Sequence, residues 1–335
     1  MFKKRRLKLK INGESPRSLI LAFVLAKFKC DVYIFNSLVN SELNNADQIF
    51  LFSNFLKNLL INFDIWNEFE DIIYSFNSIE FKDNIISEKL LLRSEISEKN
   101  INTIGWTAKD SDIKRLITNK LKDLDNVHFI LKNQLLDESL IFDFEFNFKN
   151  YNEYRLKTFK STNEQILIFN VFLRGNIEKR LYEINTTDGL IILTPINNNF
   201  YQILWKNVPI QIKERSQNYK SFFLDNLTTL LPNELKVDQI IGDINSFNVR
   251  DISSNCIVKN ESIFLNENKF KSNILFYLNF DIIIVNILQF FYFLEKNYSK
   301  NIWIINNLGF RYLYRKYVEL KIKFSLSIFF INLFT

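Results

Sequence analysis

The chain has 335 residues, which is long enough for one large domain or for two interleaved domains with a sizeable core. It contains one histidine, His128, and two isolated cysteines, Cys30 and Cys256, so metal sites are not predicted and His128 is the single candidate base for Ser-His or Cys-His catalysis. The formal net charge is +6, but the aromatic residues stand among aliphatic residues rather than beside arginine, so no nucleic-acid platform is predicted.

Residues 7–36 have the order of a dinucleotide-binding strand–helix–strand unit. Residues 7–11 alternate between apolar and charged side chains as a strand does, and residues 31–35 form a second, apolar strand. Between them, residues 12–18 form a compact polar turn and residues 19–27 are compatible with a helix. This order predicts a Rossmann-like start to the fold.

The turn before this helix holds four candidate nucleotide-binding residues, Gly13, Ser15, Pro16 and Ser18. Three glycines in such a turn let the backbone approach a diphosphate, and here Ser15 and Ser18 stand in the second and third glycine positions. The whole chain has only 6 glycines, which argues against several phosphate-cradling loops. The alternative is a helix-opening turn without a ligand, with Ser15 as the N-cap and Pro16 at an early helical position.

The next segment, up to residue 130, predicts helices and strands in alternation. The helices are expected over 46–62, 65–69 and 110–124, and the strands over 79–81, 89–93 and 126–130. The last strand is expected to rejoin the first sheet, and it makes His128 a packed strand residue rather than a catalytic base.

From residue 164 the pattern changes to long strands separated by turn residues. Strands over 165–173, 180–186, 190–194 and 201–205 predict an antiparallel sheet. A helix over 218–231 ends at Pro232, a strand-like stretch covers 256–258, and apolar helices close the chain.

Three segments bear on membrane contact. The basic cluster within residues 3–10 is interpreted as a solvated tail, the alternatives being contact with anionic lipid or nucleic acid. Residues 274–294 approach membrane-spanning length but contain Asn279 and Asp281, so a buried helix is the better interpretation. Residues 324–334 are too short to span and would suit contact with a membrane surface or a partner. No cleavable signal peptide is evident.

Four stretches, taken in order, carry a family resemblance. They are Ile-Asn-Gly-Glu-Ser-Pro-Arg-Ser-Leu-Ile-Leu-Ala at 11–22, Ile-Trp at 65–66 with Ile-Glu-Phe-Lys-Asp at 79–83, Ile-Gly-Trp-Thr-Ala-Lys-Asp-Ser-Asp-Ile-Lys-Arg-Leu at 104–116, and Tyr-Glu at 182–183 with Thr-Asp-Gly-Leu-Ile-Ile-Leu-Thr-Pro at 187–195 and Ile-Leu-Trp at 203–205. They are similar to the FAD turn, the Trp-containing helix and strand, the Gly-Tyr-then-helix element and the substrate-domain strands of the flavin-dependent aromatic hydroxylases. The subgroup that the chain resembles most is the ubiquinone-biosynthesis (2-octaprenyl-phenol type) hydroxylases.

The resemblance implies an α/β fold in which a Rossmann-like FAD-binding domain is interleaved with an antiparallel-sheet substrate domain, followed by a helical C-terminus. Residues 1–63, 104–163 and 236–335 would form the dinucleotide-binding domain, and residues 64–103 and 164–235 the substrate domain. It also implies an FAD-dependent monooxygenase that hydroxylates an aromatic ring of a polyprenylated quinone precursor, with NAD(P)H as electron donor. The flavin supplies such chemistry, so no catalytic residue is assigned.

Several family motifs are replaced. Asn36 or Phe35 stands where the family has an acid that binds the ribose, and Asn36 joins the candidate cofactor-binding residues. The family's Gly-Asp and His-Pro motifs are absent from residues 256–275, and its middle Asp-Gly motif is absent near residues 141–154. The alternative is therefore a non-catalytic relative that has lost FAD and acts as a scaffold or binding subunit. The expected partners are a lipophilic aromatic substrate and other quinone-synthesis proteins, and the expected location is cytoplasmic or peripheral at the inner membrane face.

Overall fold

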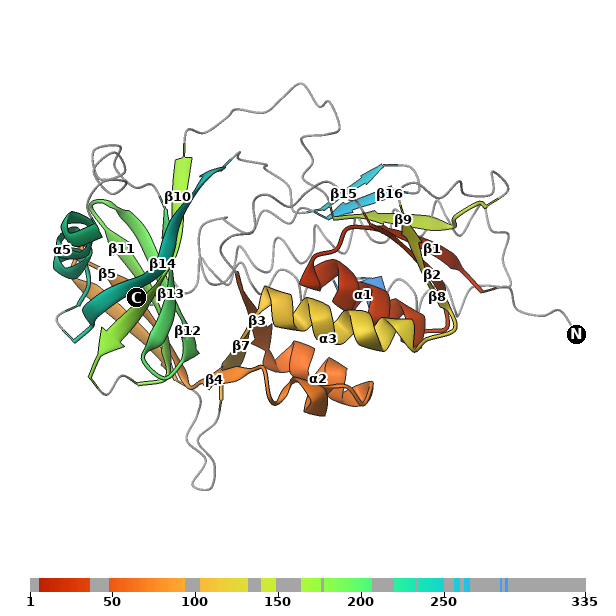
Figure 1. The fold of residues 1–335 in the computed structure, drawn as a ribbon, viewed down its shortest axis with the longest axis horizontal. Coiled ribbons are helices and arrows are strands. Elements are labelled where there is room, and N and C mark those ends of the chain that lie inside the picture. Colours follow the sequence, from red (N-terminus) through yellow and green to blue (C-terminus); the bar gives the residue numbers. More distant parts are fainter. Residues whose placement is uncertain are drawn as a thin grey trace, which may run out of the picture.

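The computed structural model describes residues 6–36, 48–93, 103–131, 140–148, 164–175, 178–206, 220–232, 234–249, 256–259, 262–265, 284 and 287–288 (Figure 1). Strands in these ranges form three sheets. Two large sheets lie at opposite ends of the molecule and a small one lies between them (Figure 1).

The first sheet has the order β15-β16-β9-β1-β2-β8. Its strands are β1 (Lys8–Asn12), β2 (Asp31–Asn36), β8 (Val127–Leu131), β9 (Phe144–Asn147), β15 (Cys256–Lys259) and β16 (Ser262–Leu265). All neighbours are parallel except β15 and β16. The predicted strand–helix–strand unit and the return of residues 126–130 to its sheet are confirmed.

Helices α1 (Pro16–Lys27) and α3 (Asp110–Lys122) cover one face of this sheet (Figure 1). α1 is apolar on almost every side and is buried along most of its length, as expected for a central helix. α3 is amphipathic, and its Ile113, Ile117 and Leu121 are fully buried. α2 (Asn54–Asn62) and the 3-10 helix η1 (Trp66–Phe69) complete this first core.

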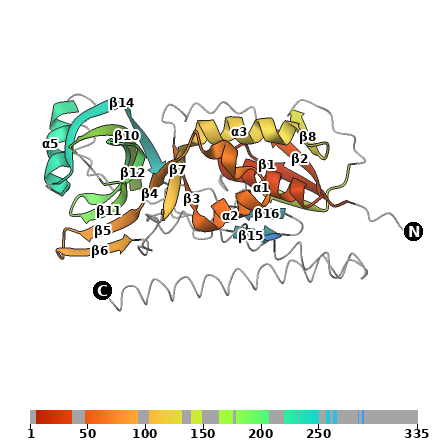
Figure 2. The same ribbon diagram turned by 90° about the horizontal axis from the view of Figure 1, so that it is seen from below.

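The second large sheet has the order β14-β10-β13-β12-β11-β5-β6. Its strands are β5 (Ser78–Asp83), β6 (Glu88–Arg93), β10 (Glu164–Arg174), β11 (Arg180–Thr186), β12 (Gly189–Asn197), β13 (Phe200–Lys206) and β14 (Lys236–Val249). Helix α5 (Lys220–Leu230) packs on one face and closes a second core around Phe169 and Trp205. Figure 2 shows β5 and β6 at one edge of this sheet.

The small sheet joins the two large ones. It contains β3 (Ile49–Ser53), β7 (Gly105–Lys109) and β4 (Tyr74–Phe76), in antiparallel pairs. The Thr107 hydroxyl donates to the carbonyl of Pro195 at 2.6 Å, and the Ile49 N–H donates to Oε1 of Gln202 at 3.2 Å. These buried hydrogen bonds fix the second large sheet against the small sheet.

The helix predicted over 46–62 is wrong in its first part. Residues 49–53 form strand β3, and α2 begins only after Ser53, whose hydroxyl accepts from the Leu56 N–H at 3.1 Å. A short apolar run cannot be assigned to helix or strand by periodicity alone, and here pairing with β7, which the sequence did not predict, decides the outcome.

The second sheet also differs from the prediction. β11 pairs with β5 in parallel although the sheet was expected to be antiparallel. β14 was not predicted, and it lies beside β10, so residues 236–249 belong to this sheet although they were assigned to the dinucleotide-binding domain. The remaining domain boundaries stay a prediction.

The α/β fold class is confirmed, but most of the predicted C-terminal helical region lies outside the described residues. Of it, the structure describes Ile284, Ile287 and Leu288, and the first two are buried in the first core. Among the described residues no helix has both the length and the apolar character needed to cross a membrane.

Candidate functional site

The turn between β1 and α1 is closed by packing at Gly13. This residue has φ +144°, a conformation that favours glycine. A Cβ added to it would lie 2.8 Å from Cβ of Phe148, which directly follows β9. The Phe148 N–H donates to the carbonyl of Asn12 at 2.9 Å and holds that strand end in place. The space beside Gly13 is therefore filled by the protein's own chain.

The two serines of the turn hydrogen-bond to each other's backbone. Ser15 is the N-cap of α1, and its hydroxyl accepts from the Ser18 N–H at 3.2 Å. The Ser18 hydroxyl donates to the Ser15 carbonyl at 2.8 Å, and Ser18 is fully buried. Pro16 opens the helix and has no N–H to offer. The structure therefore confirms the capped start of α1, and nucleotide binding by Gly13, Ser15, Pro16 and Ser18 stays a prediction.

This arrangement predicts a structural role for Ser15. Replacing it with alanine is expected to lower the free energy of unfolding by about 1 kcal/mol, because an N–H of the first turn of α1 loses its acceptor. Ser15→Asp keeps an acceptor and is expected to retain the wild-type value. Urea denaturation of both variants checks this, and equal stability of Ser15→Ala and wild type would contradict the capping role.

Asn36 is the last residue of β2, and only its backbone is described. Parallel pairing sets Asn12 beside Phe35, so Asn36 lies at the same carboxyl edge of the sheet as the Gly13 turn. Ligands bind at this edge in open α/β sheets. The position is compatible with the predicted role, which stays a prediction for Asn36.

A buried polar cluster that the sequence did not predict lies at this edge. Asn12 donates through Nδ2 to Oε1 of Glu145 and to Oδ1 of Asn147, both at 2.5 Å. Asn147 is 2% exposed and its own Nδ2 has no hydrogen-bond partner. Since side chains alternate along a strand, the cluster lies on the face opposite to buried Ile11 and Phe146, away from α1. The sequence pattern did not predict β9, a strand of four residues whose pairing partners β1 and β16 lie more than 100 residues away along the chain.

A small cavity lies where the α1 turn faces the second large sheet. Its lining includes Ser15, Pro16 and Arg17 from the turn, Phe50 from β3 and Leu204 from β13. Its volume is about 30 Å³. In this measure one water needs about 10–15 Å³, whereas small-molecule sites measure roughly 300–1,000 Å³. The cavity has no room for a tricyclic ring.

Nucleophilic chemistry finds no support in Cys30 or His128. Burial raises the pKa of the Cys30 thiol to about 12, so the thiolate is scarce at neutral pH. His128 lies in β8 as predicted, with its ring 4.7 Å from that of Tyr33. The described residues also contain no cluster of His, Cys, Asp and Glu able to hold a metal ion.

Solved structures share this arrangement of sheets. PqsL, a probable FAD-dependent monooxygenase from Pseudomonas aeruginosa, superposes with a TM-score of 0.64 at 9% identity, over 91% of this chain and 91% of its own. The p-nitrophenol 4-monooxygenase PnpA from Pseudomonas putida DLL-E4 gives 0.53 at 11% identity, over 77% and 72%. CmlS, a flavin-dependent halogenase, gives 0.65 at 11% identity, over 93% and 62%. The chain has the fold of flavin-dependent monooxygenases.

Sequence comparison gives a different neighbour. No protein-family model matches the chain. It is 26% identical over 296 residues, covering 78% of this chain and 86% of the other, to a protein named DNA polymerase III subunit delta of Buchnera aphidicola subsp. Schizaphis graminum (strain Sg). This identity is too low to assign the chain to a family.

The described residues do not fit FAD in the manner of a glycine-rich turn. Phe148 fills the space at Gly13, and the serines use their hydroxyls and the Ser18 N–H on each other. The cavity beside the turn is about tenfold smaller than a small-molecule site. At this edge, the buried Nδ2 of Asn147 is a donor without a hydrogen-bond partner.

Proposed function

We propose that this chain is a non-catalytic relative of the flavin-dependent hydroxylases of ubiquinone biosynthesis, acting as a scaffold or binding subunit for other quinone-synthesis proteins. The observation that carries this proposal is the mutual hydrogen bonding of Ser15 and Ser18, which closes the turn that would hold the FAD diphosphate. The monooxygenase fold supports the relationship to flavoproteins. The four stretches of sequence resemblance support the ubiquinone type.

A second candidate is an active FAD-dependent monooxygenase that hydroxylates an aromatic ring of a polyprenylated quinone precursor, with NAD(P)H as donor. Asn147 favours it, because a buried donor without a partner at the carboxyl edge of parallel strands is what a bound ligand would satisfy. In that case FAD supplies the redox chemistry, and the chain would have to hold it with a turn more open than the one described.

The visible absorption spectrum of the purified protein separates the two candidates. After incubation with excess FAD and removal of the unbound portion, we expect a folded, colourless protein. A flavin band near one equivalent per chain would overturn the non-catalytic proposal. Reduction of that flavin by NAD(P)H in the presence of quinone precursors would then be the next measurement.

A matched variant tests whether the hydroxyls of Ser15 and Ser18 prevent FAD binding. Ser15→Gly combined with Ser18→Gly removes both hydroxyls and leaves the rest of the turn unchanged. If the serines alone exclude the diphosphate, this variant gains FAD that the wild type does not retain. Ser53→Gly, at the N-cap of α2, is the control, because it removes a serine cap remote from the turn.

Partners and location are part of the same proposal. Binding to a lipophilic aromatic substrate, or to other quinone-synthesis proteins, would bring the protein from the cytoplasm to the inner membrane face. We propose no nucleic-acid partner. Two of the basic residues near the N-terminus already have acidic partners, since Lys10 pairs with Glu145 at 2.9 Å and Arg6 lies 3.5 Å from Asp31.

A further inference from the structure

An open groove of about 730 Å³ lies where three turns of the second large sheet meet. Its lining residues include Asn77 and Ser78 from the β4–β5 connection, Glu178 and Lys179 before β11, and Asn198 and Asn199 between β12 and β13. The volume lies within the range of roughly 300–1,000 Å³ seen for ligand sites. The groove shares no lining residue with the small cavity beside Ser15.

Hydrogen bonds between the turns hold the groove open. The Asn77 N–H donates to the Lys179 carbonyl at 2.8 Å. Nδ2 of Asn199 donates to the Gly175 carbonyl at 2.6 Å, and both of these residues have positive φ, at +51° and +99°. The three turns that line the groove are far apart in the sequence, yet each forms a hydrogen bond with another. A ligand would therefore meet a preformed site and would not have to order it.

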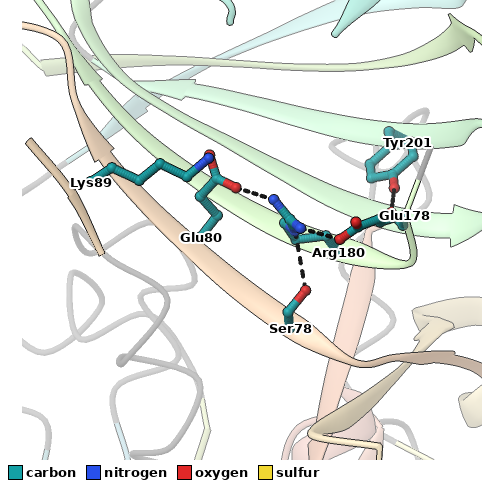
Figure 3. A network of polar contacts seen from close by, with 6 residues as sticks. All are labelled: Ser78, Glu80, Lys89, Glu178, Arg180 and Tyr201. Atoms are coloured by element: carbon teal, nitrogen blue, oxygen red, sulfur yellow. Dashed lines mark hydrogen bonds and ion pairs between the residues drawn. The ribbon is translucent and has the colours of Figure 1, made fainter. Parts of the chain in front are cut away.

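A buried ionic network fixes one rim of the groove (Figure 3). Arg180 is 7% exposed, pairs with buried Glu80, and donates through Nε to Ser78 Oγ at 3.1 Å. Its other terminal nitrogen pairs with Glu178, whose side chain is 65% exposed at the groove. The ion pair with buried Arg180 therefore fixes the position of the Glu178 carboxylate.

The side-chain groups that remain for a ligand among the described asparagines are the Asn77 amide and Nδ2 of Asn198, because Asn199 donates to the Gly175 carbonyl and Oδ1 of Asn198 accepts from the Tyr74 hydroxyl at 3.0 Å. Glu178 is paired with Arg180, and the Lys179 ammonium lies 5.1 Å from the centre of the Tyr74 ring. The side-chain amide of half-buried Asn77, by contrast, makes no hydrogen bond to any other described residue. An amide presents a donor and an acceptor side by side, which is the complement of a peptide group.

We propose that this groove binds an extended, uncharged segment of a partner polypeptide through its main chain. The two opposite charges at the rim cancel, which favours a ligand without net charge, and the amides favour one in which N–H and C=O groups alternate. The identification of the occupant as a partner chain rests on the proposed function as a binding subunit.

Nuclear magnetic resonance of the full chain, labelled with ¹⁵N at asparagine, tests this with N-acetyl-triglycine amide as the probe. We expect the side-chain signals of Asn77 and Asn198 to shift on titration. Asn77→Ala breaks no hydrogen bond within the described protein, so it should fold, and it is expected to weaken binding about five- to tenfold. Asn67→Ala, at an exposed site on η1, is the matched control and should leave binding unchanged.

Two further probes test which chemical groups the groove recognises. An analogue with the central amide replaced by an ester loses one N–H donor and is expected to bind more weakly. Maltotriose offers hydroxyls without peptide groups and is expected to produce no shift. Absence of shifts with the peptide, equal binding to Asn77→Ala, or a response to maltotriose alone would each overturn the proposal. The spectrum with FAD is independent, so failure of the proposed function and failure of this groove give different results.

Discussion

Arg180→Met is expected to lower the free energy of unfolding by about 3 to 5 kcal/mol, the usual effect of removing one partner from a buried ion pair. The side chain of Glu80 is 1% exposed, and without Arg180 its carboxylate keeps one cation, Lys89, at 2.9 Å. The loss comes from a charge that stays buried with too few partners. Chemical denaturation followed by circular dichroism measures it.

Two comparison variants make this result specific. Glu80→Met combined with Arg180→Met removes both buried charges and is expected to recover most of the lost stability. Arg115→Met removes a partner from the exposed pair with Asp112, where the arginine side chain is 72% exposed, and should cost less than about 1 kcal/mol. If Arg180→Met were no more harmful than Arg115→Met, the buried network would have no stabilising role.

The same network depends on the register of the parallel pair of β11 and β5. Register sets Arg180 beside Ser78 and Tyr182 beside Glu80, so the ion pair crosses from β11 to β5 diagonally. A shift by one residue would turn these side chains to the opposite face and leave both charges unpaired. We therefore expect the double variant to be less specific in its β5 register than the wild type.

Gly13→Ala is expected to cost about 2 to 4 kcal/mol, from two sources that add. The positive φ of +144° strains any residue with a side chain, and the new methyl would lie 2.8 Å from Cβ of Phe148. Trimming Phe148 to alanine would not relieve the contact, because the atom in conflict is Cβ itself. Denaturation midpoints with an unchanged slope would measure the loss.

Gly242→Ala is the matched control for this prediction. Gly242 also has positive φ, at +74°, but a Cβ there meets no atom within 4 Å. It therefore reports the cost of a positive φ without a packing conflict, and Gly13→Ala, which has both a larger φ and the contact with Phe148, should cost more. Equal losses would mean that Phe148 moves aside freely.

If Gly13→Ala stayed folded but abolished quinone production in cells, the non-catalytic proposal would be contradicted, since the turn would then be needed for chemistry.

The sequence predicted the elements whose pattern is complete within a short segment. The alternation of residues 7–11, the apolar run of α1 and the amphipathic face of α3 each repeat a period that a strand or helix imposes. It also offered both interpretations of the Ser15 turn. Capping depends on residues three positions apart, so the sequence contains all that the cap requires.

By itself, the sequence determined the Rossmann-like opening, and it supplied the serine and proline that make the capped start of α1 one of two interpretations of the turn. Only the tertiary structure decided that residues 49–53 are a strand, that Phe148 occupies the space beside Gly13, and that Arg180 pairs with a glutamate 100 positions away. The physical reason is the same in each case. Strand pairing, close packing and burial of charge depend on which distant segment lies alongside, and no local pattern of side chains specifies that neighbour.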